Sequence, residues 1–391
     1  MNKQSKLSVN SPEARAIANH IHPYTNPELI KNDGPHIITS GEGIYVTDSN
    51  NKSFIEGMSG LWCTSFGYNE NELIDAAITQ LRKLPFYHSF TGKTVDPAID
   101  LAEKLISIAP DSDLDKVFFC NSGSEANDTA VKMIWYYFAS KGMPQKRKII
   151  GRRRGYHGVT VVAASLTGLP YAQDGFGIPL DFAKHTLSPH FFADSLEGES
   201  ESDFVKRLMS ELESLIEKEG SDTIGAMFAE PVMGAGGVIV PPKGYFDALQ
   251  KLLKKHNILL VADEVICGFG RTGNMWGSQT FDIKPDILTC AKALSSSYLP
   301  ISAVMASSEI VEGVEKQAAK LGIFGHGYTY SASPVPAAVA LRTLELMEER
   351  KIIDHVKKMK PIFAERVKAL GGYSSVGHVR SVGLIGAMEF V

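Results

Sequence analysis

The lysine most suited to covalent chemistry in this sequence is Lys292. It follows a short, mostly apolar run at 285–291 and precedes mostly small residues at 293–297. Apolar surroundings disfavour the charged ammonium form of a lysine, because desolvation of a charge is costly. A neutral lysine amine is the nucleophile that forms a Schiff base with a carbonyl group. The alternative is that Lys292 lays its stem on apolar neighbours and reaches water, as many surface lysines do.

A second candidate site is the segment Ser122-Gly123-Ser124. It follows an apolar segment that we predict to be a strand, and it opens a predicted helix. Backbone N–H groups at a helix N-terminus bind anions, and the two hydroxyl groups add further donors, so one phosphate monoester would fit. The sequence lacks the glycine and lysine spacing of nucleotide-binding loops. The simpler reading is an ordinary helix start with Ser124 as the N-cap.

Carboxylates and an aromatic residue follow other predicted strands. Asp263 and Glu230 each end an apolar segment, and Tyr156 and His157 follow a third. A buried carboxylate such as that of Asp263 needs a cationic partner, for example a protonated ring nitrogen, although a helix cap or an ordinary ion pair are the alternatives. The carboxyl ends of parallel strands meet at one edge of a sheet, where ligands bind. We therefore expect these residues to converge on one site.

The hydrophobic pattern predicts an α/β fold. Continuous apolar strands that alternate with amphipathic helices are typical of a mostly parallel sheet with helices on both faces. Strands are predicted at 116–120, 147–151, 225–230, 258–263, 286–290 and 301–306, and helices at 124–140, 158–166, 202–218 and 244–256. Two long helices at 334–349 and 352–370 and a final strand predict a smaller domain. We expect an N-terminal arm and part of the small domain at 1–60, a large domain at 61–330 and an incomplete small domain at 331–391.

The composition excludes several classes of protein. The formal charge is -4, and the basic runs at 146–154 and 251–255 are short, which argues against nucleic-acid binding. No stretch of about 18 apolar residues occurs, so we expect neither a membrane span nor a secretory signal. The four cysteines show no metal-ligand spacing, so no metal site is predicted. A cytoplasmic protein without nucleic-acid or membrane partners is the expectation.

Taken together, the motifs resemble those of class III aminotransferases, and most of all the ω-amino acid/amine:pyruvate branch. The resemblance covers about residue 20 to 391, and the motifs stand in the family's order and spacing. They are Asn121-Ser122-Gly123-Ser124-Glu125-Ala126, Tyr156-His157-Gly158, Ala229-Glu230-Pro231-Val232, Asp263-Glu264-Val265, Gly268-Phe269-Gly270-Arg271-Thr272-Gly273, Ala291-Lys292 and His326-Gly327-Tyr328-Thr329. The resemblance implies the fold of pyridoxal-phosphate enzymes of fold type I: a large domain with a mostly parallel mixed sheet, and a smaller α+β domain from the two terminal segments.

The resemblance also implies roles at a pyridoxal 5'-phosphate cofactor. Lys292 would hold the cofactor as an internal aldimine, a Schiff base, and move a proton between the substrate and the cofactor. Asp263 would keep the pyridine nitrogen protonated. Tyr156 would stack on one face of the ring and Val265 would pack on the other. These implied roles make Lys292, Asp263 and Tyr156 the expected catalytic residues.

The phosphate group would be bound by Ser122, Gly123 and Ser124, and by Thr329 from a neighbouring subunit. This contribution from Thr329 implies a homodimer with shared active sites, with a tetramer left open.

The remaining site residues also rest on the resemblance. His157 is placed at the cofactor, and Glu230 resembles the family's buried carboxylate near the cofactor face. Tyr24, Trp62 and Phe90 match positions where this branch places aromatic side chains around the substrate. Such a pocket favours primary amines with apolar or ω-amino tails.

The expected reaction is a ping-pong transfer of an amino group from a primary amine or ω-amino acid to pyruvate, which leaves as alanine. Three alternatives stay open: a 4-aminobutyrate or ornithine type that uses 2-oxoglutarate, an aminomutase of the same fold, and an inactive, truncated homologue that binds the cofactor. Family members continue for several tens of residues beyond the point where this chain stops. We therefore expect the chain to lack the C-terminal part of the small domain, including an arginine that pairs with the substrate carboxylate.

Overall fold

The computed structural model describes residue 8 and residues 10–391, and the chain divides into two compact units at residues 71 and 72. The first unit contains two short helices, each with a proline at its start and a polar N-cap, Ser11 or Asn26. A three-stranded antiparallel sheet and a short helical segment follow. The elements are α1 (Pro12–Asn19), α2 (Pro27–Asp33), β1 (Ile38–Glu42), β2 (Tyr45–Asp48), β3 (Ser53–Ile55) and α3 (Ser59–Trp62).

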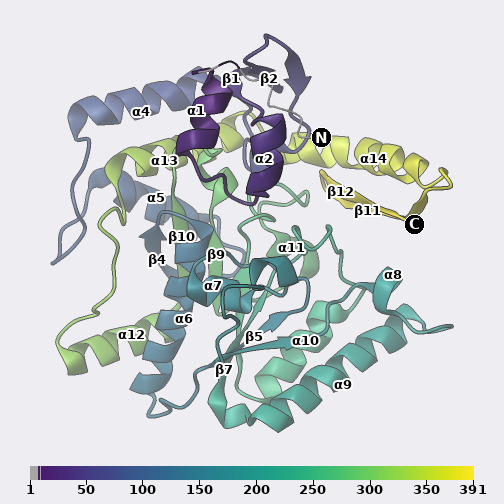
Figure 1. Ribbon diagram of the computed structural model, residues 1–391. Coiled ribbons are helices and arrows are strands. Elements are labelled where there is room, and N and C mark those ends of the chain that lie inside the picture. The colour runs from purple at the N-terminus through teal and green to yellow at the C-terminus, as the bar shows by residue number, and fades with distance from the viewer. Residues whose placement is uncertain (1–7, 9) are drawn as a thin grey trace. The chain divides into compact units, whose positions relative to one another are not determined.

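The second unit is built on a seven-stranded sheet with the order β4-β10-β9-β8-β7-β5-β6 (Figure 1). Only β10 runs antiparallel to its neighbours within this sheet. The strands are β4 (Leu114–Cys120), β5 (Lys148–Arg152), β6 (Ala183–Thr186), β7 (Ile224–Ala229), β8 (Leu259–Asp263), β9 (Ile287–Cys290) and β10 (Ser302–Ser307). The predicted mostly parallel mixed sheet is confirmed, and β6 is a strand that the sequence analysis did not predict.

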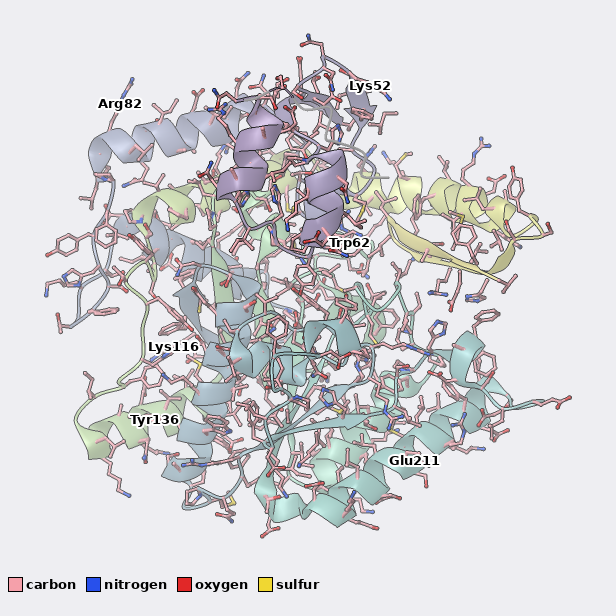
Figure 2. The ribbon with its side chains drawn as sticks, viewed as in Figure 1. Lys52, Trp62, Arg82, Lys116, Tyr136 and Glu211 are labelled. Carbon is pink, nitrogen blue, oxygen red and sulfur yellow. The ribbon has the colours of Figure 1, made fainter. Side chains whose placement is uncertain are left out.

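Helices cover both faces of this sheet, as the continuous apolar strands predicted. Successive residues of β5 show the division: Ile149 packs in a cluster with α6 residues, whereas Ile150 packs with residues of α9 and α10. Charged side chains on the outer surface of these helices, such as Glu211 on α9, are exposed to solvent (Figure 2). The hydrophobic core therefore lies in two layers, one on each side of the sheet.

The helices predicted at 124–140, 158–166, 202–218, 244–256, 334–349 and 352–370 are confirmed. Helices α8, α11 and α12 were not predicted, although the apolar residues of α12 repeat at helical spacing. The helices are α4 (Asn71–Lys83), α5 (Asp96–Ser107), α6 (Gly123–Ser140), α7 (Val161–Leu166), α8 (Phe191–Asp194), α9 (Glu201–Glu219), α10 (Tyr245–Lys255), α11 (Gly277–Phe281), α12 (Ser308–Leu321), α13 (Pro334–Glu349) and α14 (Ile352–Leu370).

The chain ends in an antiparallel hairpin of β11 (Val376–Val382) and β12 (Ile385–Phe390), which follows α14 (Figure 1). The predicted domain limits at residues 60 and 330 stay a prediction. Among the described residues, no helix is long and apolar enough to cross a membrane.

Candidate active site

A cavity of about 400 Å³ lies at the carboxyl ends of the parallel strands. Its lining includes every predicted cofactor residue except Thr329: Ser122, Gly123, Ser124, Tyr156, His157, Glu230, Asp263, Val265 and Lys292. The strands β4, β5, β7, β8 and β9 each deliver residues to it from their carboxyl ends. This is the place where open α/β sheets bind ligands.

Four predicted residues are not among the described residues that line this cavity. Thr329 and Phe90 are not in the lining of this cavity, and Tyr24 and Trp62 belong to the first unit. Phe90 lies against the loop that carries Thr329, since a Cβ added at Gly327 would lie 2.8 Å from its ring. Phe90 is 43% exposed and Thr329 is exposed. The structure thus places Phe90 and Thr329 on neighbouring surface segments.

The phosphate-type site at the start of α6 differs in one detail from the prediction. The N-cap is Ser122 and not Ser124: Ser122 Oγ accepts a hydrogen bond from the N–H of Glu125 at 3.2 Å. The helix therefore begins one residue earlier than predicted, because Gly123 already has helical geometry. Ser124 Oγ instead accepts the N–H of Val159 at 3.0 Å. By helix geometry, the N–H groups of Gly123 and Ser124 have no acceptor within the helix and can serve an anion.

The loop with Tyr156 and His157 comes close to this helix start. Gly158 has a φ of +134°, and a Cβ at this position would clash with Ser124 Oγ and approach Ala163. Only glycine fits a backbone that passes so near with this dihedral. The hydrogen bond between Val159 and Ser124 fixes the approach. Tyr156 is thereby held beside the start of α6.

Lys292 follows β9 and begins a short 3-10 helix, Lys292–Ser295. Its φ is +52°, a left-handed conformation that is uncommon for residues other than glycine. Its carbonyl oxygen accepts a hydrogen bond from the N–H of Ser297 at 3.2 Å. Strained backbone of this kind occurs most often at functional sites. Lys292 is half-buried in the cavity wall, in keeping with a reactive amine.

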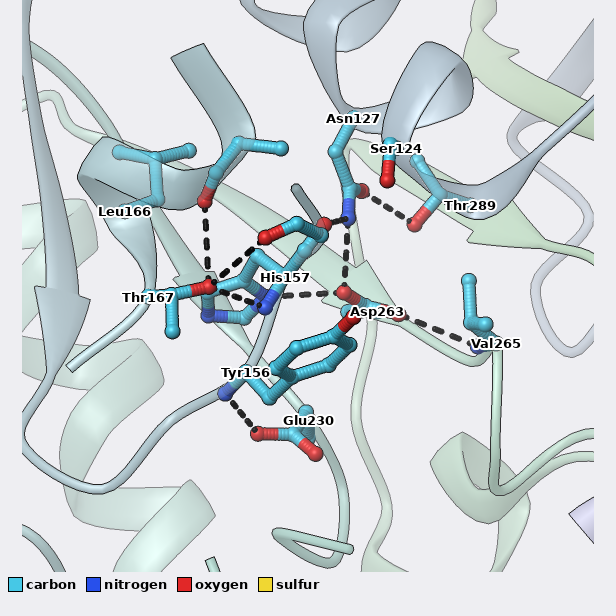
Figure 3. Close-up of polar contacts among 12 residues, drawn as sticks. Ser124, Asn127, Tyr156, His157, Leu166, Thr167, Glu230, Asp263, Val265 and Thr289 are labelled. Carbon is cyan, nitrogen blue, oxygen red and sulfur yellow. Dashed lines mark hydrogen bonds and ion pairs between the residues drawn. The ribbon is translucent and has the colours of Figure 1, made fainter. Parts of the chain in front are cut away.

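Asp263 is the last residue of β8 and is 3% exposed. Its Oδ2 accepts hydrogen bonds from Asn127 Nδ2 at 2.9 Å and from His157 Nδ1 at 2.8 Å (Figure 3). Its Oδ1 accepts the N–H of Val265 at 3.1 Å. Three donors stabilise a carboxylate in a buried position, where an isolated charge would be costly. This group can therefore face a cationic ring nitrogen.

Asn127 is a supporting residue to which the sequence analysis gave no role. Its Nδ2 also donates to the carbonyl oxygen of His157 at 2.6 Å, and its Oδ1 accepts the hydroxyl of Thr289 at 2.8 Å. One amide on α6 thus joins the ends of β8 and β9 and the loop after β5. One feature of the sequence could have indicated this role: Asn127 is a polar residue on a helix face that is otherwise apolar. Its neighbours Ala126 and Ala130 are fully buried.

Glu230 has backbone partners that the sequence could not name. Its Oε1 accepts the N–H of Tyr156 at 3.0 Å, and its Oε2 accepts the N–H of Gly234 at 2.9 Å. Burial raises the pKa of the Glu230 carboxyl, while the nearby His157 and Arg152 act in the opposite direction. Glu230 therefore fixes the backbone of the loop that carries Tyr156.

Polar contacts hold the loop that contains Thr329 against α6. His326 Nδ1 lies 2.8 Å from Lys132 Nζ, and its Nε2 lies 2.9 Å from Thr129 Oγ1. Burial, and then the charge of Lys132, lower the pKa of His326 to about 4. The ring is therefore neutral near pH 7, with Nδ1 as the acceptor from Lys132 and Nε2–H as the donor to Thr129. Tyr328 joins the same chain through a 3.2 Å contact with Thr129.

The residues around the cavity fit a phosphorylated pyridine aldehyde. The start of α6 offers donors for a phosphate group, Asp263 offers a buried carboxylate for a protonated ring nitrogen, and Lys292 offers an amine for the aldehyde carbon. Tyr156 and Val265 add an aromatic and an aliphatic wall. This fold and this set of groups define a pyridoxal-phosphate enzyme of fold type I.

Comparison with known proteins gives the family. A family model described as aminotransferase class III matches residues 30–391. A probable γ-aminobutyrate transaminase 3, mitochondrial, from rice (Oryza sativa subsp. indica) is 49% identical over 390 residues, which are 99% of this chain and 76% of the relative. The chain belongs to the class III aminotransferases, and it is a pyridoxal-phosphate-dependent aminotransferase.

Solved structures agree with this assignment. The ω transaminase of Pseudomonas jessenii in complex with PMP superposes with a TM-score of 0.96 at 50% identity, covering 97% of this chain and 84% of that one. A transaminase solved with L-alanine gives a TM-score of 0.89 at 52% identity, covering 91% of this chain and 84% of that one. The predicted fold, cofactor and enzyme class are confirmed by these likenesses.

Glu264, the neighbour of Asp263, makes a testable contribution to stability. It is fully buried and accepts hydrogen bonds from the N–H of Gly277 at 2.9 Å and from Ser278 Oγ at 2.6 Å. Burial raises the pKa of Glu264 to about 7, although these hydrogen bonds oppose the shift. The folded protein thus holds a proton that the unfolded chain releases near pH 4.5. Its stabilising contribution is complete below that pH and is lost as the pH rises through 7.

We expect the difference in free energy of unfolding between wild type and Glu264→Gln to shift by roughly 3 kcal/mol in favour of the variant between pH 4.5 and pH 8. Urea titrations across this range measure it. Glu211→Gln on α9 is the control, because it removes a carboxylate that is exposed to solvent. A pH-independent difference for Glu264→Gln would contradict the raised pKa.

Proposed function

We propose that this aminotransferase transfers the amino group of a primary amine or ω-amino acid to pyruvate and releases alanine. The observation that carries the choice of acceptor is the charge of the cavity. Among the described residues that line it, Lys292 is the only lysine or arginine. A keto acid with a single carboxylate needs fewer cationic partners than 2-oxoglutarate does. The similarity to a transaminase solved with L-alanine supports the same acceptor.

The second candidate is a 4-aminobutyrate type that uses 2-oxoglutarate. It is favoured by the name of the rice relative, a probable γ-aminobutyrate transaminase. The two candidates share their chemistry and differ in the acceptor. The cytoplasmic location expected from the sequence stays a prediction, since the same relative is named as mitochondrial.

The roles proposed for the residues follow from their positions in the cavity. When bound, pyridoxal phosphate acts as an electron sink for the carbanion that forms as the substrate Cα loses a proton. Lys292 holds the cofactor through its amine, and that amine also carries the proton from and to the substrate Cα. Asp263 holds the proton on the ring nitrogen, helped by the donors from Asn127 and His157.

The other side chains bind and orient. Tyr156 and Val265 lie at the cavity on different strand ends and fix the plane of the ring between them. Ser122, Gly123 and Ser124 bind the phosphate at the start of α6.

We infer a homodimer in which Thr329 serves the site of a second copy. Thr329 and Phe90 lie outside the cavity of their own chain and are exposed. Large apolar residues near them in the sequence are also exposed: Phe86, Tyr87, Leu321, Ile323 and Tyr330. An exposed apolar patch of this kind is typical of a protein–protein interface. A second copy would cover this patch and receive Thr329 and Phe90 at its own site.

The covalent role of Lys292 is testable by reduction. Borohydride treatment of the wild-type enzyme with pyridoxal phosphate should fix the cofactor on the peptide that contains Lys292, and mass spectrometry measures the added mass. Lys292→Ala should carry no fixed cofactor and lose at least about 10³-fold in rate. The exposed Lys284→Ala is the matched control and should behave as wild type. Labelling of Lys292→Ala equal to wild type would refute the assignment.

The acceptor is testable by rate. With one amine donor at saturation, we expect kcat/KM for pyruvate to exceed that for 2-oxoglutarate by about 10-fold or more, because the described residues that line the cavity include no arginine or lysine besides Lys292, which binds the cofactor. Steady-state assays with both keto acids measure the ratio. A higher value for 2-oxoglutarate would favour the 4-aminobutyrate type instead.

The dimer is testable by mass and by affinity. Light scattering should give about twice 42.6 kDa for the purified protein. Thr329→Ala should raise the Kd of the apoenzyme for pyridoxal phosphate about 10- to 100-fold, since a hydrogen bond to a charged phosphate is lost. Thr94→Ala, at another exposed threonine, is the control. A monomeric, fully active enzyme would contradict the shared site.

A further inference from the structure

The side chain of Arg380, on the hairpin strand β11, binds two backbone carbonyl oxygens, one carboxylate and one imidazole nitrogen. Its Nε donates to the carbonyl oxygens of Gly237 at 2.9 Å and Val238 at 3.1 Å, and one terminal nitrogen donates to Gly237 again at 2.6 Å. The other terminal nitrogen donates to Glu389 Oε2 at 2.6 Å and lies 3.1 Å from His378 Nδ1. The side chain is only 10% exposed. Its position is therefore sharply defined.

Glu389, on the partner strand β12, keeps this guanidinium in place. Its Oε2 also lies 3.0 Å from His190 Nε2. His190 Nδ1 accepts the N–H of Ala193, so the proton of a neutral ring sits on Nε2 and is donated to Glu389. Burial, and then the charge of Arg380, lower the pKa of His190, which keeps the ring neutral. The hairpin is thus tied to the segment before α8 and to the turn at residues 237–238.

That turn, residues 233–239, has an unusual backbone. Met233 and Ile239 pair as an antiparallel bridge, and the N–H groups of Gly237 and Val238 both bind the carbonyl oxygen of Gly234. Val238 has a φ of +52°, which is rare for a β-branched residue. Such a conformation persists only when surrounding contacts hold it. Arg380 supplies these contacts, because it binds the carbonyl oxygens of both Gly237 and Val238.

The same turn supports the loop that carries Tyr156. The N–H of Gly234 binds Glu230 Oε2, and Glu230 Oε1 binds the N–H of Tyr156. A Cβ at Gly236 would clash with the carbonyl oxygen of Arg154, so the turn packs directly on the backbone two residues before Tyr156. The contacts run without a break from Arg380 through the turn to the wall of the cavity.

We propose that Arg380 is a positioning residue that sets the Tyr156 side of the cofactor cavity. It does so by fixing the turn at residues 233–239, and Glu389 assists by orienting its guanidinium. Arg380 touches neither cofactor nor substrate in this role. The inference rests on the cofactor contact proposed above for Tyr156, and it is independent of which keto acid is the acceptor.

The geometry requires arginine and not merely a positive charge. A guanidinium presents five N–H donors in a fixed, planar fork and can serve two carbonyl oxygens and a carboxylate at once. A lysine ammonium at this position would keep the charge opposite Glu389, but it cannot span the three acceptors in the same arrangement. Arg380→Lys should therefore behave more like Arg380→Met than like wild type.

The test measures cofactor binding and the surroundings of the bound cofactor, in addition to rate. Apoenzymes are titrated with pyridoxal phosphate while tryptophan fluorescence is followed, and circular dichroism of the bound cofactor reports the asymmetry of its surroundings. We expect Arg380→Met and Arg380→Lys to raise the Kd about 10-fold and to change the dichroism of the bound cofactor. Glu389→Gln should shift the Kd in the same direction by a smaller factor.

Arg342→Met is the matched control. Arg342 on α13 also pairs with several carboxylates, those of Glu72, Glu345 and Glu349, and it does not line the cavity. Its loss should lower the thermal midpoint but leave Kd and dichroism at wild-type values. If Arg380→Met does not fold, Arg380→Lys and Glu389→Gln carry the test. If the folded Arg380 and Glu389 variants show the Kd and dichroism of the wild type, the proposal for Arg380 is wrong. If the wild-type enzyme itself fails to bind pyridoxal phosphate, the proposed function is wrong instead.

Discussion

The site depends on one buried carboxylate and the donors that hold it. Asp263 sits at the end of β8 with 3% of its surface exposed, and it accepts hydrogen bonds from Asn127, His157 and the N–H of Val265. These donors lie on helix α6, on the loop after β5 and on the segment that directly follows β8. A buried charge survives only with such partners, so the three segments must meet at one place. The carboxylate therefore fixes the relative positions of the cavity walls.

Helix α6 is the common support of the features assigned to the cofactor. Its first residues form the phosphate-type site, and Asn127, one turn later, holds Asp263. Thr129 and Lys132, further along the same helix, hold His326 and with it the loop of Thr329. Distances along a single helix vary little, because its backbone hydrogen bonds are all internal. The separation between phosphate site and ring-nitrogen carboxylate is thus set by one rigid element.

The sequence revealed the residues that follow strands, because parallel strands must end at a common edge and polar residues there stand out against apolar segments. Lys292, Asp263 and Glu230 are of this kind. It could not reveal Asn127 as a support, nor the partners of Glu230, because these contacts join segments far apart in the chain. The true N-cap, Ser122, was missed because either serine satisfies the same capping rule. Strand β6 was missed because its residues, Ala-Lys-His-Thr, do not form an apolar run. It is an edge strand that pairs only with β5, and such a strand does not need to be apolar throughout.

Several residues other than glycine near the site have left-handed backbone, and two of them show how the shape of the site is maintained. Lys292 with φ +52° follows β9, and Val238 with φ +52° lies in the turn behind Glu230. Each such residue costs on the order of 1–3 kcal/mol, which surrounding contacts must offset. At Val238 the offset comes from Arg380, whose guanidinium binds two successive carbonyl oxygens. The shape of the cavity is therefore maintained partly by hydrogen bonds from a hairpin that takes no part in the chemistry. A change in that hairpin would consequently reach the cavity through the turn at residues 233–239 and the carboxylate of Glu230.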